Sequence, residues 1–228
     1  MRPMLRPFSR MAFLAVSLVL VGGLLAAPVA AQTDDAAPSA QTHDQAIKTP
    51  AGKFIQSLGD RAIGVIANKN ISQTQRTDKF RLILQDSFDL MTIGRFVIGR
   101  TWNAATPEQQ KEYMNLFEAL VIKSYGDRLT LYTGEGFTVT GARAESEKDF
   151  IVNSQITHPD GSTPTTIDWR VRNRNNKLGV IDVVVEGVSL SVTQRQEYAA
   201  VIQRNGGQID GLLTMMHQQL QGGAEGAN

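Results

Sequence analysis

The 228-residue sequence contains no cysteine, which excludes disulfides, thiolate metal sites and cysteine nucleophiles. The core must therefore be held together by packing. Histidine is scarce: of the three, His43 falls in a polar linker, His158 in a turn and His217 at an exposed helix position. None of them has a second His, Asp or Glu at metal-ligand spacing on a shared helix face. We therefore predict no metal site and no cofactor.

Catalytic motifs are also missing. The segment Gly187–Ser191 is not a nucleophile elbow, because it ends in Ser rather than Gly. The segment Gly206–Gly211 lacks the spacing of a dinucleotide-binding loop and follows a predicted helix rather than a strand. Asp182 and Glu186 could form a carboxylate pair, but they stand about 13 Å apart by strand rise and no other feature supports that mechanism. The sequence therefore predicts a protein that is not an enzyme.

The sequence also lacks an excess of basic residues. The formal charge of +1 includes Arg2, Arg6 and Arg10, which all lie in a predicted leader. Removing these three from the 23 basic residues leaves 20 against 22 acidic ones. A nucleic-acid-binding domain normally carries a basic surface, so we expect no nucleic-acid partner.

The first thirty-one residues have the pattern of a secretory signal. Three arginines precede an apolar run over 11–25, and small residues at 29–31 provide a cleavage site before Gln32. The run is shorter than the roughly 20 residues needed to span a bilayer, although an uncleaved anchor is the alternative. We expect a Sec-type signal peptide (1–31), a flexible linker (32–48), one domain (49–221) and a disordered tail (222–228). In a bacterium the product would be periplasmic.

The first half of the domain has helical periodicity. Helices are predicted from Thr49-Pro50 onward, at about 72–87, from Asp89 to Gly99, and from Thr106 to about residue 131. Trp102 is expected in a connection. The apolar stripe of the fourth helix is wider than one packing contact needs. This width indicates either a helix that contacts a sheet and a neighbouring helix, or one that also contacts an apolar ligand.

The second half alternates apolar and polar residues with the period of a strand. Segments near 137–141, 150–156, 167–172 and 180–185 predict an antiparallel meander with one face against the helices. Two more helices should follow, the first capped by Ser191 or Thr193 and ended at Asn205-Gly206-Gly207, the second over 209–220. The fold class is therefore α+β. Asp182, in a Val-rich strand, is expected to pair with Arg170 on the adjacent strand.

Two stretches carry a resemblance to a known family. One is Val184–Leu190, together with the Gly206–Leu213 entry to the last helix. The other runs from Phe88 to Trp102, with Ile98 where a Leu is usual, and continues into the next helix at Gln110, Tyr113, Phe117 and Tyr125. Over roughly residues 50–220 the sequence resembles the MlaC/toluene-tolerance family of periplasmic phospholipid-binding proteins, which includes hopanoid-associated, HpnM-like relatives.

The resemblance implies a lipid carrier. Its fold would be a strongly curved antiparallel sheet of about four strands, packed against several helices and enclosing an apolar pocket. It would shuttle phospholipid between an outer-membrane lipoprotein–porin complex and the substrate-binding subunit of an inner-membrane ABC transporter complex, which maintains outer-membrane lipid asymmetry. A hopanoid cargo and a non-catalytic protein-binding module of the envelope are the alternatives.

Apolar residues on the predicted helices and strands provide the expected pocket lining. Each of them singly is more typical of ordinary core. The expected lining residues are Phe96, Tyr113, Phe117, Leu120, Val121, Tyr125, Leu129, Val152, Ile167, Trp169, Val171, Ile181, Val183, Val185, Val201 and Ile202. Glu186, at the end of the central strand, is expected at the pocket rim, where it could contact a lipid headgroup or a partner protein.

Overall fold

A computed structural model describes residues 44–126, 132 and 134–222. The predicted signal peptide, most of the linker, Leu129 and nearly all of the tail lie outside these residues. In the part of the chain that the structure describes, no helix is both long and apolar enough to cross a membrane.

Helices α2 to α8 lie within the described residues, and most of them begin at side-chain caps. Ser72 forms a capping box with Gln75, and Asp89 accepts from the backbone N–H of Thr92 at 3.0 Å, as expected of short polar residues at a helix start. The helices are α2 (Pro50–Ile66), α3 (Gln73–Ser87), α4 (Leu90–Ile98), α5 (Thr101–Ala104), α6 (Pro107–Gly126), α7 (Leu190–Arg204) and α8 (Asp210–Gln221).

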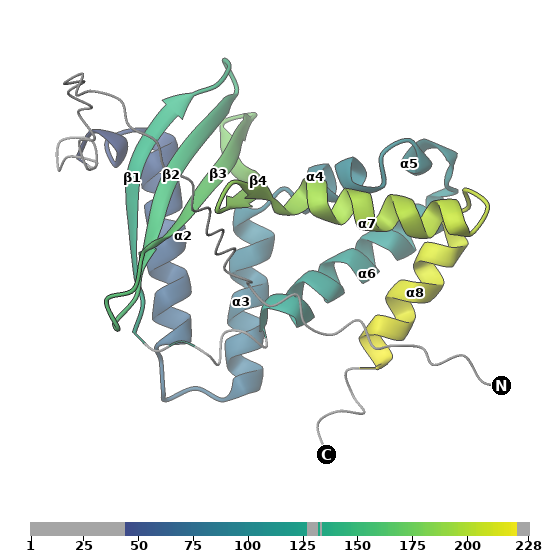
Figure 1. The fold of residues 1–228 in the computed structure, drawn as a ribbon, viewed down its shortest axis with the longest axis horizontal. Coiled ribbons are helices and arrows are strands. Elements are labelled where there is room, and N and C mark those ends of the chain that lie inside the picture. Colours follow the sequence, from purple (N-terminus) through teal and green to yellow (C-terminus); the bar gives the residue numbers. More distant parts are fainter. Residues whose placement is uncertain (1–43, 127–131, 133, 223–228) are drawn as a thin grey trace, which may run out of the picture. The chain divides into compact units, whose positions relative to one another are not determined.

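A five-stranded antiparallel sheet follows α6 in the chain (Figure 1). Its strand order is the sequence order, so the predicted meander and the α+β class are confirmed. The strands are β1 (Gly136–Ala144), β2 (Asp149–Thr157), β3 (Thr165–Arg174), β4 (Lys177–Val185) and β5 (Val188–Ser189). About four strands were expected, and the fifth is a two-residue strand that the Glu186-Gly187 turn brings back beside β4.

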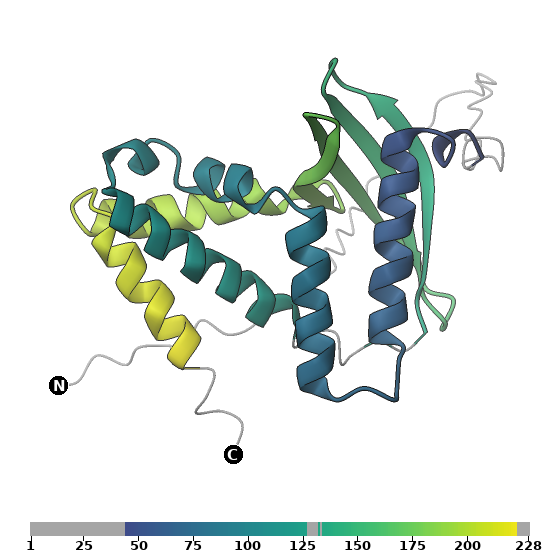
Figure 2. The same ribbon diagram turned by 180° about the vertical axis from the view of Figure 1, so that it is seen from behind.

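Helices α2 and α3 cover one face of this sheet (Figures 1 and 2). The strand register places Val152 opposite Trp169 and Trp169 opposite Val183, so these three side chains share the covered face. α2 packs on β1 and β2, whereas α3 packs on β4. α2 approaches β1 closely at Gly59, which has no side chain. A Cβ at that position would be 2.2 Å from the ring of Phe137. We name this side the apolar face of the sheet.

The buried side chains form two separate cores. The sheet core joins the apolar face to α2 and α3, and it includes Ile55, Val139, Val152, Val171 and Val180. The helical core joins α4, α5, α6, α7 and α8, and its fully buried members are Val97, Tyr113, Leu212 and Met216. The two cores share no buried residue.

Several element boundaries differ from the sequence prediction. Trp102 lies in the short helix α5 rather than in a connection. α7 begins at Leu190, because the hydroxyl of Ser189 accepts from the backbone N–H of Val192 at 3.1 Å. The predicted caps, Ser191 and Thr193, are therefore inside the helix. Packing also begins before the predicted domain start at residue 49, since Ala46 is buried in the sheet core.

Candidate functional site

The sheet residues expected to line a pocket lie together on the apolar face. The register aligns Ile167 with Val185 and Trp169 with Val183. The indole N–H of Trp169 donates to the hydroxyl of Ser154 at 2.9 Å, and that hydroxyl donates to the carbonyl of Ile167 at 3.0 Å. Ser154 is thus satisfied inside an apolar surface. The sequence had correctly grouped these strand positions, because their period of two fixes which side chains share a face.

Coverage of the apolar face is uneven. Val152 and Val171 are fully buried in the sheet core. Trp169, Val183 and Val185 keep part of their surface exposed. Ile181, which stands in the β-bulge of β4, is also only partly buried. The partly exposed group therefore offers the apolar surface in the sheet that its own helices do not fully cover.

The helix residues expected in the same lining lie elsewhere. Tyr113 stacks on Phe117 with ring centroids 5.8 Å apart, and both are buried in the helical core. Leu120, Val121, Val201 and Ile202 belong to or pack against that core as well. The predicted lining residues therefore fall into two groups in the structure, and their contact with lipid stays a prediction.

Two further predicted lining residues are exposed. Phe96 is 43% exposed, and the guanidinium of Arg195 lies 5.0 Å from its ring centroid. Tyr125, near the end of α6, is 38% exposed. Both lie at the surface of the helical half in the structure, not in either core.

Asp182 connects the sheet to α7. It stands opposite Arg170 in the register, as predicted, but its carboxylate accepts from the hydroxyl of Ser189 at 2.7 Å and from the backbone N–H of Ser191 at 3.2 Å. The predicted ion pair with Arg170 is wrong, because that guanidinium lies 3.6 Å from Glu145 instead. Asp182 therefore fixes the start of α7 against β4.

Glu186 has a structural role in the turn after β4. It adopts a positive φ of 49°, and Gly187 follows with a φ of 77°. Its carboxylate accepts hydrogen bonds from the backbone N–H and the hydroxyl of Thr166, and the former bond holds its pKa below the ordinary value. Glu186 is exposed at the end of the sheet, and its contact with a headgroup or partner stays a prediction.

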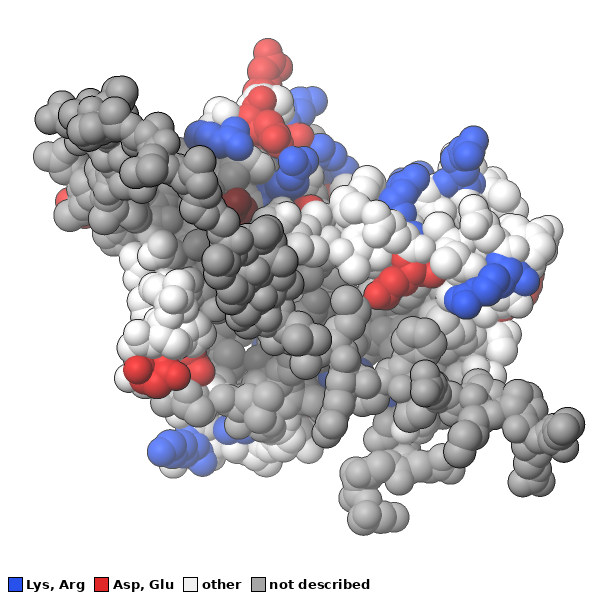
Figure 3. Space-filling model, in the orientation of Figure 1, with Lys and Arg blue, Asp and Glu red and all other residues white. Residues whose placement is uncertain are grey.

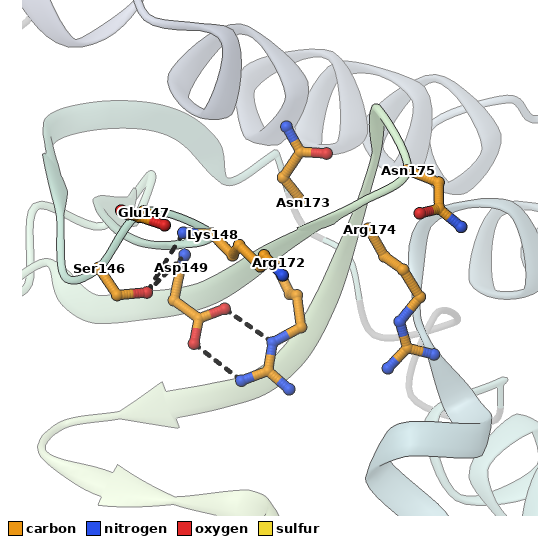
Figure 4. A pocket seen from close by; sticks show the side chains of 8 residues that line it. All are labelled: Ser146, Glu147, Lys148, Asp149, Arg172, Asn173, Arg174 and Asn175. Atoms are coloured by element: carbon orange, nitrogen blue, oxygen red, sulfur yellow. Dashed lines mark hydrogen bonds and ion pairs between the residues drawn. The ribbon is translucent and has the colours of Figure 1, made fainter.

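Two hollows among the described residues are polar. One has a volume of about 650 Å³ and lies between the turn joining β1 to β2 and the end of β3 (Figure 4). Within it Arg172 binds Asp149 through two hydrogen bonds of 2.7 Å each. A second hollow of about 210 Å³ is lined mostly by charged residues, and Phe88, Leu178 and Gly179 complete it. Neither is the expected apolar pocket, which stays a prediction.

Sequence reasoning missed the Asp149–Arg172 pair. The two-residue period of this strand places Asp168, Arg170 and Arg172 on one face, but it does not indicate which carboxylates of other strands would face the arginines. That information depends on the pairing of β2 with β3, which sets Asp149 opposite Arg172.

A family model for the MlaC protein matches residues 56–218 of this chain, which is well over half of its length. The chain belongs to the MlaC family. Among curated MlaC-family relatives, the toluene tolerance protein Ttg2D of Pseudomonas putida is 29% identical over 106 residues. That match covers 46% of this chain and 49% of the relative, so the chain spans about half of it.

A longer match joins the chain to a second curated relative. The intermembrane phospholipid transport system binding protein MlaC of Haemophilus influenzae is 23% identical over 172 residues, covering 72% of this chain and 79% of the relative. The fold is similar to that of a phospholipid-binding protein from Ralstonia solanacearum, solved in complex with a phospholipid. The TM-score is 0.67 at 24% identity, over 74% of this chain and 96% of that one.

Among the described residues of this MlaC-family chain, no group of three or more His, Cys, Asp or Glu side chains is placed to bind a metal ion. The ring nitrogen Nε2 of His158 lies 3.1 Å from the hydroxyl of Thr165, in the turn region where the sequence placed it. His217 Nε2 lies 2.7 Å from a carboxylate oxygen of Glu112, which joins α8 to α6. Both histidines thus have structural neighbours.

Acid should weaken the Asp149–Arg172 pair. The hydrogen bonds from Arg172 hold the pKa of Asp149 below its ordinary value. A carboxyl whose pKa is lower in the folded state stabilises fully above its unfolded pKa, and that contribution is lost as pH falls through the folded pKa. In thermal melts from pH 7 to pH 3, Asp149→Asn should therefore cost more stability at pH 7 than at pH 3. An equal loss of stability at both pH values would contradict the pairing.

Proposed function

We propose that this protein is a periplasmic, non-enzymatic lipid carrier that binds phospholipid acyl chains on an apolar internal surface. It would receive and deliver lipid at an outer-membrane lipoprotein–porin complex and an inner-membrane ABC transporter complex. The observation that carries the proposal is the MlaC-family match over residues 56–218. The names of the relatives add support, because one is a binding protein of a phospholipid transport system and another was solved with a phospholipid.

The physical need for such a surface is large. Transfer of one methylene from water to an apolar environment is worth about 0.8 kcal/mol, so an acyl chain of a dozen methylenes would lose on the order of 10 kcal/mol if it were left in water. A carrier must therefore cover the chain and keep the headgroup near solvent. It needs no nucleophile, metal or redox group for this task.

We assign the acyl chains to the apolar face of the sheet. Trp169, Val183 and Val185 support this assignment, because each points to that face and keeps part of its surface exposed. The helical core is less suited, since Tyr113 and Leu212 are fully buried against their protein neighbours. A chain bound at the apolar face would complete the cover that α2 and α3 provide.

Protein purified without detergent from its native host should carry lipid. Solvent extraction followed by mass spectrometry should yield a glycerophospholipid in a fixed ratio to protein. A triterpenoid in its place would identify the hopanoid alternative. Extracts free of any lipid, from protein shown to be folded by circular dichroism, would contradict the carrier function.

Val183→Glu should remove bound lipid with little loss of thermal stability. The new carboxylate would face the acyl chains, and burying a charge beside hydrocarbon is costly. Val192→Glu is the matched control, because Val192 is 42% exposed on α7, outside the sheet core. Lipid content and melting temperature should be measured on both variants. If Val183→Glu melts far below the wild type and retains lipid while folded, Val183 belongs to ordinary core.

A further inference from the structure

Basic residues gather at one end of the sheet. The β1–β2 and β3–β4 turns lie at this end, and we name residues 143–149 and 170–177 the hairpin end. It contains six basic residues and three acidic ones. The rest of the chain after the predicted leader has the opposite balance, with fourteen basic and nineteen acidic residues. Figure 3 shows charged side chains gathered at the top of the molecule, where Figure 1 shows the two turns.

Backbone hydrogen bonds hold the hairpin end in shape. The N–H of Asn173 donates to the carbonyl of Lys148 at 2.7 Å, which joins the two hairpins. The hydroxyl of Ser146 accepts from the N–H of Asp149 at 3.1 Å. Asn175 and Asn176 adopt positive φ values of 52° and 61°, as a two-residue hairpin turn requires. The hollow of about 650 Å³ lies between these two turns.

The basic side chains at this end differ in their ion pairs. Arg172 is held by Asp149, Arg170 lies near Glu145, and Arg174 lies 3.5 Å from Asp89 of α4. Within the described residues, by contrast, no ion pair engages the side chains of Arg143, Lys148 and Lys177. The hollow is lined by three cations, Lys148, Arg172 and Arg174, and by two carboxylates, Glu147 and Asp149, so its lining has a positive balance.

We propose that the hairpin end is a docking site for an acidic surface of a protein partner. Fixed cations around a concave, hydrogen-bonding hollow suit carboxylates presented by a folded or peptide surface. A membrane surface fits less well, because inserted apolar side chains usually add to the electrostatic attraction in membrane binding. The large apolar residues that the described part exposes, such as Leu82, Phe96 and Val188, belong to other elements.

This docking role does not depend on lipid binding. The apolar face carries Trp169 and Val183, whereas the register places Arg143, Arg170 and Arg172 on the opposite face of the sheet. The same protein sample can therefore be tested for both properties, and one can fail while the other holds.

Isotope-labelled protein should be titrated by NMR with an oligoglutamate peptide at low ionic strength. Amide shifts should concentrate at the hairpin end. The double variant Lys148→Glu/Lys177→Glu should bind the peptide at least about tenfold more weakly, because reversing charge at a docking site replaces attraction by repulsion. Lys148→Gln/Lys177→Gln should give an intermediate loss. Lipid content should stay unchanged in both variants, which separates this result from the carrier function.

The matched control is Lys53→Glu/Lys79→Glu, which reverses two exposed lysines on α2 and α3. It should bind the peptide as the wild type does. Equal weakening in both double variants would overturn the proposal, because the attraction would then follow only net charge. Phosphatidylglycerol vesicles are the second probe. Amide perturbation at the hairpin end by these vesicles but not by the peptide would also overturn it, in favour of a membrane contact.

Discussion

Replacing Tyr113 by alanine should lower the free energy of unfolding by about 3–5 kcal/mol, the usual cost of removing a large buried aromatic side chain. Tyr113 is fully buried at the centre of the helical core. Its ring stacks on Phe117 and meets Trp102 edge-on at a centroid distance of 6.4 Å. Its hydroxyl donates to the carbonyl of Gly94 at 3.0 Å, so α6 and α4 would lose both packing and a buried hydrogen bond.

Urea denaturation of Tyr113→Ala and Tyr113→Phe measures these two contributions separately. The phenylalanine variant keeps the ring and loses only the hydroxyl, so it should cost about 1 kcal/mol. Burial raises the pKa of Tyr113 above its ordinary value, which keeps the hydroxyl protonated and able to donate. A loss below about 1 kcal/mol in the alanine variant would show that this site is not packed as described.

Replacing Asp182 by alanine should cost about 3 kcal/mol, because it leaves buried donors without an acceptor. Its carboxylate accepts from Ser189, from the N–H of Ser191 and from the N–H of Val183 at 2.9 Å. The first turn of α7 should also open more often in this variant. We expect faster amide hydrogen exchange at Ser191 and Val192 in this variant, measured beside its free energy of unfolding.

Arg170→Ala is the discriminating control for Asp182. If Asp182 depended on an ion pair with Arg170, removing either residue would give a similar loss. In the structure Arg170 is exposed and its nearest carboxylate belongs to Glu145, so its loss should stay within about 0.5 kcal/mol, as for most surface substitutions. A loss of stability in Arg170→Ala close to that in Asp182→Ala would instead support an ion pair between the two residues.

Local chemistry made much of the fold predictable. The hydroxyl of Thr106 accepts from the N–H of Gln109 at 3.2 Å, and the Gln109 side chain accepts from the N–H of Thr106 at 3.0 Å. Both partners lie within four residues, so the sequence alone specifies this helix start. The same holds for the cap at Asp89 and for the two-residue period of β3. Such features depend only on neighbours along the chain.

The division of the apolar residues could not be predicted in this way. Tyr113 and Val183 both appear in the sequence as members of apolar stripes, yet one lies in the helical core and the other on the apolar face of the sheet. Which surface covers a stripe depends on how α6, α8 and the strands pack, and that is set by contacts far apart in sequence. The predicted partner of Asp182 was wrong for the same reason. A β-bulge in β4 and the return of β5 beside that strand bring Ser189 to Asp182.

The separation of the sheet core from the helical core has a consequence for motion. Among the described residues, the two halves are joined by local contacts, such as that of Asp182 with the start of α7, and their buried side chains form two clusters rather than one. Local opening free energies differ between cooperative units of one chain. The bundle of α4 to α8 can therefore open locally, for example at α8, while the strands keep their pairing and α2 and α3 stay packed on them.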